Sequence, residues 1–152
     1  MASYHPHPGR YPENKANDFT RLVADLNGPT IICGDMNCIN PEDELDREKL
    51  IAAFESFSDA AELAVDRFIQ SGQSVFGALG AIGFHDAIPP ANRRYTMPTD
   101  LINKDKSSAM RIDHILVNDT IKVVMGEVIH SADSNRASDH HPVKLDFQIS
   151  AL

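Results

Sequence analysis

Residues 30–37 read TIICGDMN and join an apolar segment directly to two polar side chains. The first four residues form a short apolar run rich in β-branched side chains, which is typical of a buried strand in an α/β layer. The GDMN that follows at once places an acid, Asp35, and an amide, Asn37, where the strand ends. Taken alone, Asp35 is as readily a turn residue and Asn37 more often a cap. Polar side chains at strand ends nevertheless converge on one rim of a sheet, the usual place for a site.

Helices are predicted before and after this strand in the sequence. Residues 13–26 form an amphipathic pattern that Asn27-Gly28-Pro29 stops. Residues 41–57 carry a second apolar face, and a capping-box start at Asp59 and Glu62 predicts a third helix to about Gln70, ended by Gly72. The small, Gly-rich residues 74–83 give no clear prediction.

Strands dominate the last third of the chain. Residues 111–118 and 121–130 are predicted strands, and in the first of these Ile112 and Leu116 face one way while Ile115 and Val117 face the other. Residues 143–149 alternate apolar and polar side chains, which predicts a strand with one wet face.

Composition narrows the class of protein. The chain has 152 residues, enough for one domain over residues 1–152. Its net charge of −8 argues against binding nucleic acid by bulk electrostatics, although a bound cation could neutralise a phosphate. Cys33 and Cys38 are read as a core thiol and a loop thiol without a zinc or disulfide pattern. No apolar run could span a membrane and the N-terminus is no signal peptide, so we expect no membrane association and a cytoplasmic location.

Two more polar clusters stand against apolar strands. Residues 111–115 read RIDHI and residues 138–143 read SDHHPV. An acid in mid-strand, Asp113, is costly unless it is paired, and a histidine is a natural partner.

In this order, GDMN, RIDHI and SDHHPV resemble the motifs GDxN, R[IL]D[YH]I and SDHxPV of the endonuclease/exonuclease/phosphatase superfamily, also called the DNase I-like fold. Tyr95-Thr96 resembles the aromatic-Thr pair that often precedes the second motif. His5 resembles a histidine that ends a family strand, and His7 is the alternative match. The resemblance implies an α/β (α+β) fold in which two packed mixed β-sheets are flanked by helices, a four-layer α/β/β/α sandwich.

The resemblance covers only the C-terminal portion of the family domain. Members have about a hundred more residues before it, including an asparagine and a metal-binding glutamate for which no equivalent is found here. We therefore expect a domain incomplete at its N-terminus, which either forms a homodimer or needs the missing N-terminal half.

The resemblance also implies a reaction, in-line attack of water on a phosphate ester with Mg²⁺ or Mn²⁺ as cofactor. The implied catalytic residues are His5, Asp35, Asn37, Asp113 and His140, and the implied metal ligands are Asp139 and Asp35. In these roles His140 is the general base or an electrostatic partner, Asp113 orients its ring, and Asn37 donates to the phosphoryl group. Asp35 orients or deprotonates the water or contributes to a metal site, and these roles stay open.

The remaining polar residues have structural interpretations. Arg111 is expected to form a structural ion pair, His114 and His141 to be structural, and Arg93-Arg94 to be a solvated loop pair. The substrate is a phosphate ester, either a nucleic acid or a small molecule. The chain has no Trp, which disfavours the abasic-site branch of the family. The alternative is a catalytically silent half-domain that acts by associating with a partner or with itself.

Overall fold

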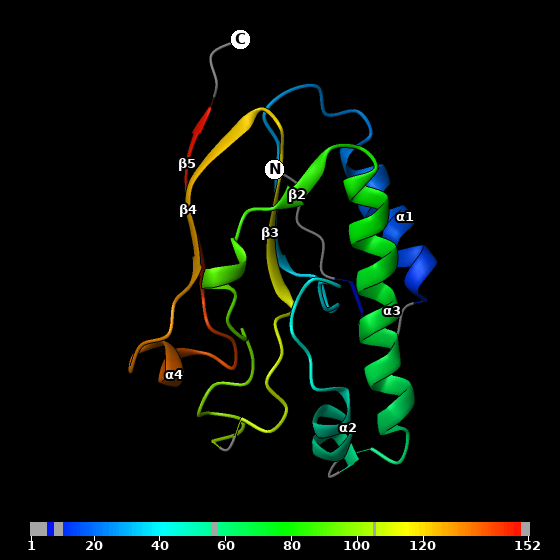
Figure 1. Ribbon diagram of the computed structural model, residues 1–152, viewed down its shortest axis with the longest axis vertical. Helices are drawn as coiled ribbons and strands as arrows, with labels where there is room; N and C mark the ends of the chain where they lie inside the picture. The colour runs from blue at the N-terminus through cyan, green and yellow to red at the C-terminus, as the bar shows by residue number, and fades with distance from the viewer. Residues whose placement is uncertain (1–5, 8–10, 56–57, 105, 150–152) are drawn as a thin grey trace.

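Two antiparallel sheets pack against each other in the computed structural model, which describes residues 6–7, 11–55, 58–104 and 106–149 (Figure 1). The three-stranded sheet has the order β1-β3-β2, formed by Ile31–Asp35, Asp113–Asn118 and Phe84–Asp86. The two-stranded sheet pairs β4 (Ile121–Val128) with β5 (Val143–Ile149). The strands β1 and β2 point the same way, and β3 runs between them in the opposite direction.

Two of the three longer helices, α1 (Pro12–Val23) and α3 (Ala61–Gly80), lie on the face of the three-stranded sheet that is turned away from β4 and β5 (Figure 1). The third, α2 (Arg47–Glu55), packs on α3 beyond the ends of the strands. A 3-10 turn, η1 (Pro90–Asn92), and a single-turn helix, α4 (Ser134–Ala137), lie in the connections. None of the helices in the described ranges is long and apolar enough to cross a membrane.

The core has one apolar layer on each side of β3. Phe19, Val75 and Leu79 of the helices pack on Ile32 and Leu116. On the opposite face, Ile115 and Val117 pack with side chains that include Val143 and Leu145 of β5. The alternation predicted for residues 111–118 is therefore confirmed, because Leu116 and its neighbours Ile115 and Val117 enter different layers.

The predicted fold class is confirmed as an α+β sandwich of packed sheets and helices. Two details differ within the described residues. The strand pairs are antiparallel rather than mixed, because β3 separates the two strands that share a direction. The far face of β4 and β5 carries no long helix in this part of the chain, so three of the four expected layers are seen.

The third helix is longer than the sequence predicted. It continues into residues 74–83 and ends at Gly80, and Gly72 lies inside it rather than at its end. A Cβ atom on Gly72 would lie 1.7 Å from the carbonyl oxygen of Ile39, so this glycine permits a close backbone crossing. The second helix begins later than predicted, since residues 41–43 form a turn and a bend, residues 44–46 have no regular structure, and Asp46 Oδ1 accepts from Lys49 N at 3.0 Å.

The strand β5 has the wet face that its alternation predicted. Lys144 on that face forms ion pairs with Asp146 at 3.0 Å and Glu127 at 3.8 Å. On the other face Val143 and Leu145 are covered, but Phe147 is 43 % and Ile149 60 % exposed. The end of the inner face of β5 is thus uncovered by the described residues.

Candidate active site

The first two motifs lie side by side because β1 pairs with β3. The register places Asp35 opposite Asp113 and Gly34 opposite His114. Gly34 has a φ of +136°, a backbone conformation that L side chains rarely adopt, at the point where the chain leaves β1. Met36 N then donates to Ile112 O at 2.8 Å. The end of the central pair therefore carries both acids on neighbouring strands.

Asn37 holds the carboxylate of Asp35 with two hydrogen bonds. Its backbone N donates to Oδ1 at 2.7 Å, and its side-chain Nδ2 donates to Oδ2 at 3.1 Å. The same Nδ2 donates to Pro6 O at 3.0 Å. Asn37 has a φ of +46°, which Asn tolerates better than most residues. These contacts fix both polar side chains of the GDMN motif in one orientation.

The third motif meets the second through Asp113 and His140. The Nδ1 atom of His140 lies 2.7 Å from Asp113 Oδ2, and the two side chains are 23 % and 14 % exposed. The hydrogen bond with Asp113 raises the pKa of His140 against the opposing effect of burial. Asp113 therefore has a histidine partner, as predicted from the free-energy cost of burying an unpaired acid.

A buried threonine joins the second motif to the third. Thr96 is fully buried, and its Oγ1 accepts from the backbone N of Ile112 at 3.1 Å and of Asp113 at 3.2 Å. Its carbonyl oxygen accepts from His141 N at 2.7 Å. The segment before the RIDHI motif thus anchors both partners of the Asp113–His140 contact.

Asp139 is exposed, and its Oδ1 accepts from Ser138 Oγ at 3.1 Å. Mg²⁺ binds carboxylate and water oxygens, and Asp35 and Asp139 supply such groups. Among the described residues, however, no three His, Cys, Asp or Glu side chains are grouped to hold a metal ion. The residues described here therefore do not by themselves make a complete metal centre.

A cavity of about 980 Å³ opens beside the polar residues. Asp35, Asn37 and His140 contribute to its lining. The rest of the lining comes from α2, α3 and the loop before β3: Lys49, Ala52, Ala53, Phe54, Phe68, Met97, Ile102, Asn103, Ser107, Ser108, Met110 and Ile112. Lys49 is the one Lys or Arg among these lining residues. The cavity thus combines a polar end with an apolar wall.

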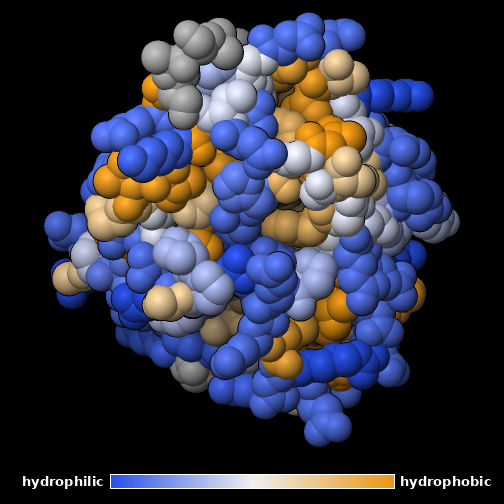
Figure 2. All heavy atoms as spheres, turned by 45° about the horizontal axis from the view of Figure 1, so that its top comes forward, coloured by the Kyte–Doolittle hydropathy of each residue, from blue (hydrophilic) through white to orange (hydrophobic). Residues whose placement is uncertain are grey.

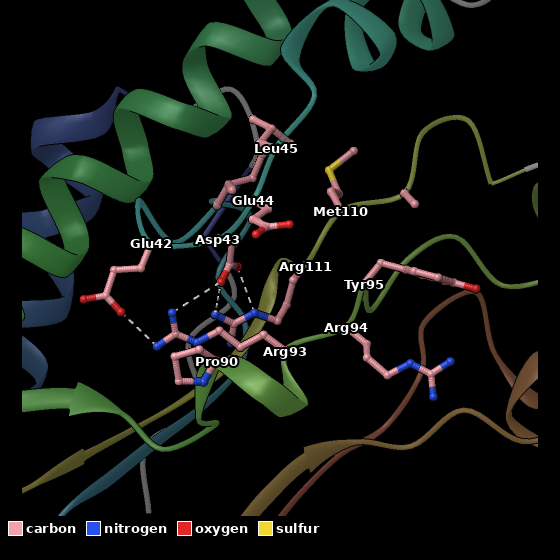
Figure 3. A pocket seen from close by; sticks show the side chains of 12 residues that line it. Glu42, Asp43, Glu44, Leu45, Pro90, Arg93, Arg94, Tyr95, Met110 and Arg111 are labelled. Atoms are coloured by element: carbon pink, nitrogen blue, oxygen red, sulfur yellow. Dashed lines mark hydrogen bonds and ion pairs between the residues drawn. The ribbon is translucent and has the colours of Figure 1, made fainter.

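A second cavity, of about 530 Å³, is lined by Arg93, Arg94 and Arg111 (Figure 3). Arg111 is buried and binds Asp43 through Nε at 2.9 Å and Nη2 at 2.7 Å, and its Nη2 binds Asp86 at 2.6 Å. Burial alone would raise the pKa of Asp86, but Arg111 lowers it below its usual value. Arg111 therefore has the structural ion pairs that the sequence suggested.

The interpretation of Arg93 and Arg94 as a solvated pair is wrong for Arg93. Its side chain is 10 % exposed, pairs with Glu42 at 2.9 Å and donates from Nε to Ile88 O at 3.0 Å. The guanidinium of Arg94 points away from that group in Figure 3. The burial of the loop against the Asp43 cluster accounts for the difference.

The two thiols also exchange the places expected for them. Cys38 is buried and Cys33 is exposed. Cys33 is the middle residue of β1 and shares the face of Ile31, where its side chain is left uncovered.

The neighbouring histidines are held in structural contacts. His114 is fully buried and its Nε2 lies 2.8 Å from Cys38 O. Burial lowers its pKa to about 4. His141 stacks on His130 with ring centroids 3.9 Å apart, and burial followed by the charge of His130 lowers its pKa. Both rings are thus disfavoured as proton carriers near neutral pH.

Two residues of the site need separate mention. His5 lies outside the described residues, and His7 is described and exposed. Lys15, which the sequence analysis did not single out, is fully buried on α1 and donates from Nζ to Asn37 O at 2.8 Å. Its position four residues before Phe19 puts it on the buried face of the helix, and that spacing is the signal that could have revealed it.

The chain belongs to the Endonuclease/Exonuclease/phosphatase family, whose sequence model matches residues 3–140. It is 29 % identical over 129 residues to an exodeoxyribonuclease of Bacillus subtilis (strain 168), a match that covers 84 % of this chain and 48 % of that protein. The chain thus spans about half the length of this relative.

Two solved structures share the fold. An AP endonuclease from Archaeoglobus fulgidus superposes with a TM-score of 0.64 at 20 % identity, covering 91 % of this chain and 53 % of that one. The 3′ phosphatase NExo (D146N) from Neisseria, bound to a product DNA hairpin, superposes with a TM-score of 0.52 at 21 % identity, covering 86 % and 49 %. At these identities the likeness shows the DNase I-like fold.

Proposed function

We propose that this chain carries part of the active site of a phosphoesterase, which hydrolyses phosphate esters by in-line attack of water. The observation that carries the proposal is the 2.7 Å contact between Asp113 and His140, beside the cavity that Asp35 and Asn37 also line. Residues from three separate motifs meet there, as a shared reaction centre requires.

The proposed roles follow from the atoms. Asp113 engages Nδ1 of His140, so Nε2 is the ring nitrogen that takes a proton from the attacking water or faces the charge that develops on phosphorus. The hydrogen bond with Asp113, which raises the pKa of His140, stabilises the protonated ring that results. Asn37 is proposed to donate from Nδ2 to the phosphoryl oxygens when a bound substrate replaces one of the two acceptors, Pro6 O and Asp35 Oδ2, that this nitrogen has here. His5 or His7 is proposed to donate as well.

The proposal includes a divalent cation, Mg²⁺ or Mn²⁺, with Asp35 and Asp139 as ligands. When bound, such an ion would offset charge on the phosphoryl oxygens and leaving group. Since the described residues do not complete its ligand set, at least one further ligand is proposed to come from elsewhere.

The proposed substrate is a phosphate ester of DNA, with a small phosphate ester as the alternative. The name of the Bacillus subtilis relative supports DNA. We further propose a cytoplasmic location, which suits the free thiols of Cys33 and Cys38.

The test is hydrolysis of bis-p-nitrophenyl phosphate, p-nitrophenyl phosphate and a labelled DNA duplex, with Mg²⁺, Mn²⁺ or EDTA. We expect turnover that needs the metal and falls by about 100-fold or more in His140→Ala and Asp139→Ala. The matched controls are His85→Ala and Asp119→Ala, whose side chains are 52 % and 86 % exposed. Activity that survives in EDTA or in His140→Ala would overturn the proposal.

A second candidate function, association without catalysis, is favoured by the uncovered end of β5. Figure 2 shows that apolar side chains reach the surface in patches between charged ones, and Phe147 and Ile149 are among the exposed apolar residues. In this case the folded chain hydrolyses nothing, and sedimentation velocity detects complexes that Phe147→Lys dissociates. A monomer at all concentrations, with no complex with the N-terminal half of a family domain, would exclude this candidate.

A further inference from the structure

The most buried charged side chain in the described residues belongs to Lys15, in the first half of α1. Its exposed fraction is 0 %. Moving an ammonium group out of water costs several kcal/mol unless it is paired or hydrogen-bonded. Most lysines on an amphipathic helix avoid this cost by reaching solvent. The partner of Lys15 must therefore be sought inside the molecule.

That partner is the turn of the GDMN motif. Lys15 Nζ donates to the carbonyl oxygen of Asn37 at 2.8 Å, in a buried contact between residues 22 positions apart. Asn37 is in the left-handed region, with φ of +46°, where a residue other than glycine is less stable. A charge-assisted hydrogen bond to its carbonyl favours the peptide orientation that this conformation requires.

The orientation of Asn37 passes directly to the acid of the motif. Its backbone N and its Nδ2 hold the two oxygens of Asp35 at 2.7 Å and 3.1 Å. If Asn37 leaves its left-handed conformation, its backbone N and its Nδ2 shift relative to Asp35 and this two-point contact weakens. The position of Asp35 thus depends on Lys15 through the contacts of Asn37.

The turn is also held from the opposite side by β3. Met36 N donates to Ile112 O at 2.8 Å, and the ring of His114 lies 2.8 Å from Cys38 O. Since burial lowers the pKa of His114 to about 4, its neutral ring donates from Nε2 to that carbonyl. Three successive residues of the turn are therefore held by the interior, and Lys15 is a contact from the helical layer.

We propose that Lys15 is a positioning residue, which holds Asn37 in its left-handed conformation and through it orients the carboxylate of Asp35. This inference rests on the proposed function for its catalytic consequence, but its structural part does not. Because Lys15 is buried, it is expected to leave substrate binding unchanged and to act on the chemical step.

The experiment compares Lys15→Met with wild type in two assays. Amide hydrogen exchange by NMR is expected to become about 10-fold faster at Asn37, equivalent to 1.4 kcal/mol, while β3 and α3 amides keep their rates. Steady-state kinetics on bis-p-nitrophenyl phosphate is expected to show kcat about 10-fold lower with KM within about twofold. The matched control is Lys122→Met, an exposed lysine on β4.

Each outcome decides one part of the inference. Unchanged exchange at Asn37, or exchange that rises equally through the chain, overturns the positioning role. Faster exchange at Asn37 in a protein whose wild type hydrolyses nothing supports positioning and contradicts the proposed function instead. Should Lys15→Met fail to fold, Lys15→Gln retains a donor for the same assays. In wild type, a scalar coupling across the hydrogen bond from Lys15 Nζ to the Asn37 carbonyl carbon is expected, and its absence with an assigned ammonium signal would refute the contact.

Discussion

The coupling free energy between Asp113 and His140 is expected to be about 1.5 kcal/mol at pH 5.5, and removing the charge of Asp113 is expected to abolish it. The structure sets this magnitude. The contact is short, at 2.7 Å, and joins two groups that are charged together, which gives about 1.5–3 kcal/mol for a hydrogen bond of this kind. The exposed fractions of 23 % and 14 % leave some screening by solvent, so we take the lower end of that range.

The sign of the pH dependence follows from the raised pKa of His140. A group whose pKa is higher in the folded state adds stability that is fully present below its unfolded pKa, near 6.5 for histidine. That stability is lost as the pH rises through the folded pKa. The contribution of the pair is therefore complete at pH 5.5 and smaller at pH 9, where a neutral ring donates to the carboxylate.

The assay is a double-mutant cycle of Asp113→Asn, His140→Gln and the double variant. The free energy of unfolding is measured by urea denaturation at both pH values in EDTA, so that no cation contributes. The control cycle uses His85 and Asp119, an exposed pair 3.7 Å apart, for which no measurable coupling is expected. A coupling below about 0.3 kcal/mol at pH 5.5, or one that increases towards pH 9, would refute the reasoning.

Three further predictions concern the close helix crossing at Gly72, the hydrogen bonds of Thr96 and the lining of the larger cavity by Lys49. Gly72→Ala is expected to destabilise the protein by about 3 kcal/mol or more, since the new Cβ would lie 1.7 Å from a backbone oxygen. Gly77→Ala, on the open side of the same helix, is expected to raise the free energy of unfolding by about 0.5–1 kcal/mol. Urea denaturation measures both changes, and equal effects would contradict the close crossing at Gly72. Thr96→Val is expected to cost about 2 kcal/mol or more in thermal denaturation, because two backbone amides lose their acceptor, and a neutral change would show that they bind elsewhere. Lys49→Ala is expected to raise KM about fivefold with kcat unchanged in the phosphodiester assay, and Lys122→Ala, on β4, is its control; an unchanged KM would place Lys49 outside the substrate's reach.

The sequence predicted the strands and the meeting of the motifs well, because both depend on local signals. The period of two in residues 111–118 fixed which side chains of β3 enter which layer. The cost of a buried acid predicted a histidine for Asp113, and the structure supplies His140. The order of the three motifs implied the fold that the solved structures share.

What the sequence could not predict depends on contacts between distant segments. Gly72 resembles a helix stop until the backbone of Ile39 is seen to cross it. Arg93 resembles a solvated loop residue until Glu42 and the Ile88 carbonyl surround it. The spacing of Lys15 and Phe19 places Lys15 on the buried face of α1, but its contact with the Asn37 carbonyl is seen only once α1 packs against the turn. In each case a residue type with a common local meaning takes another from its tertiary surroundings.

The register of β1 against β3 has a kinetic consequence. Ile31 pairs with Val117, and the same ladder brings Asp35 to Asp113 at the other end. Pairing β1 with β3 closes the long segment of chain that lies between them. This step is slow compared with forming a helix such as α3, whose hydrogen bonds join residues that are close in sequence. The candidate site therefore cannot form until β1 and β3, which are farther apart in sequence than the strands of the other described pairs, have met. Recovery of any site-specific signal during refolding thus reports completion of this sheet and lags the return of helical circular dichroism.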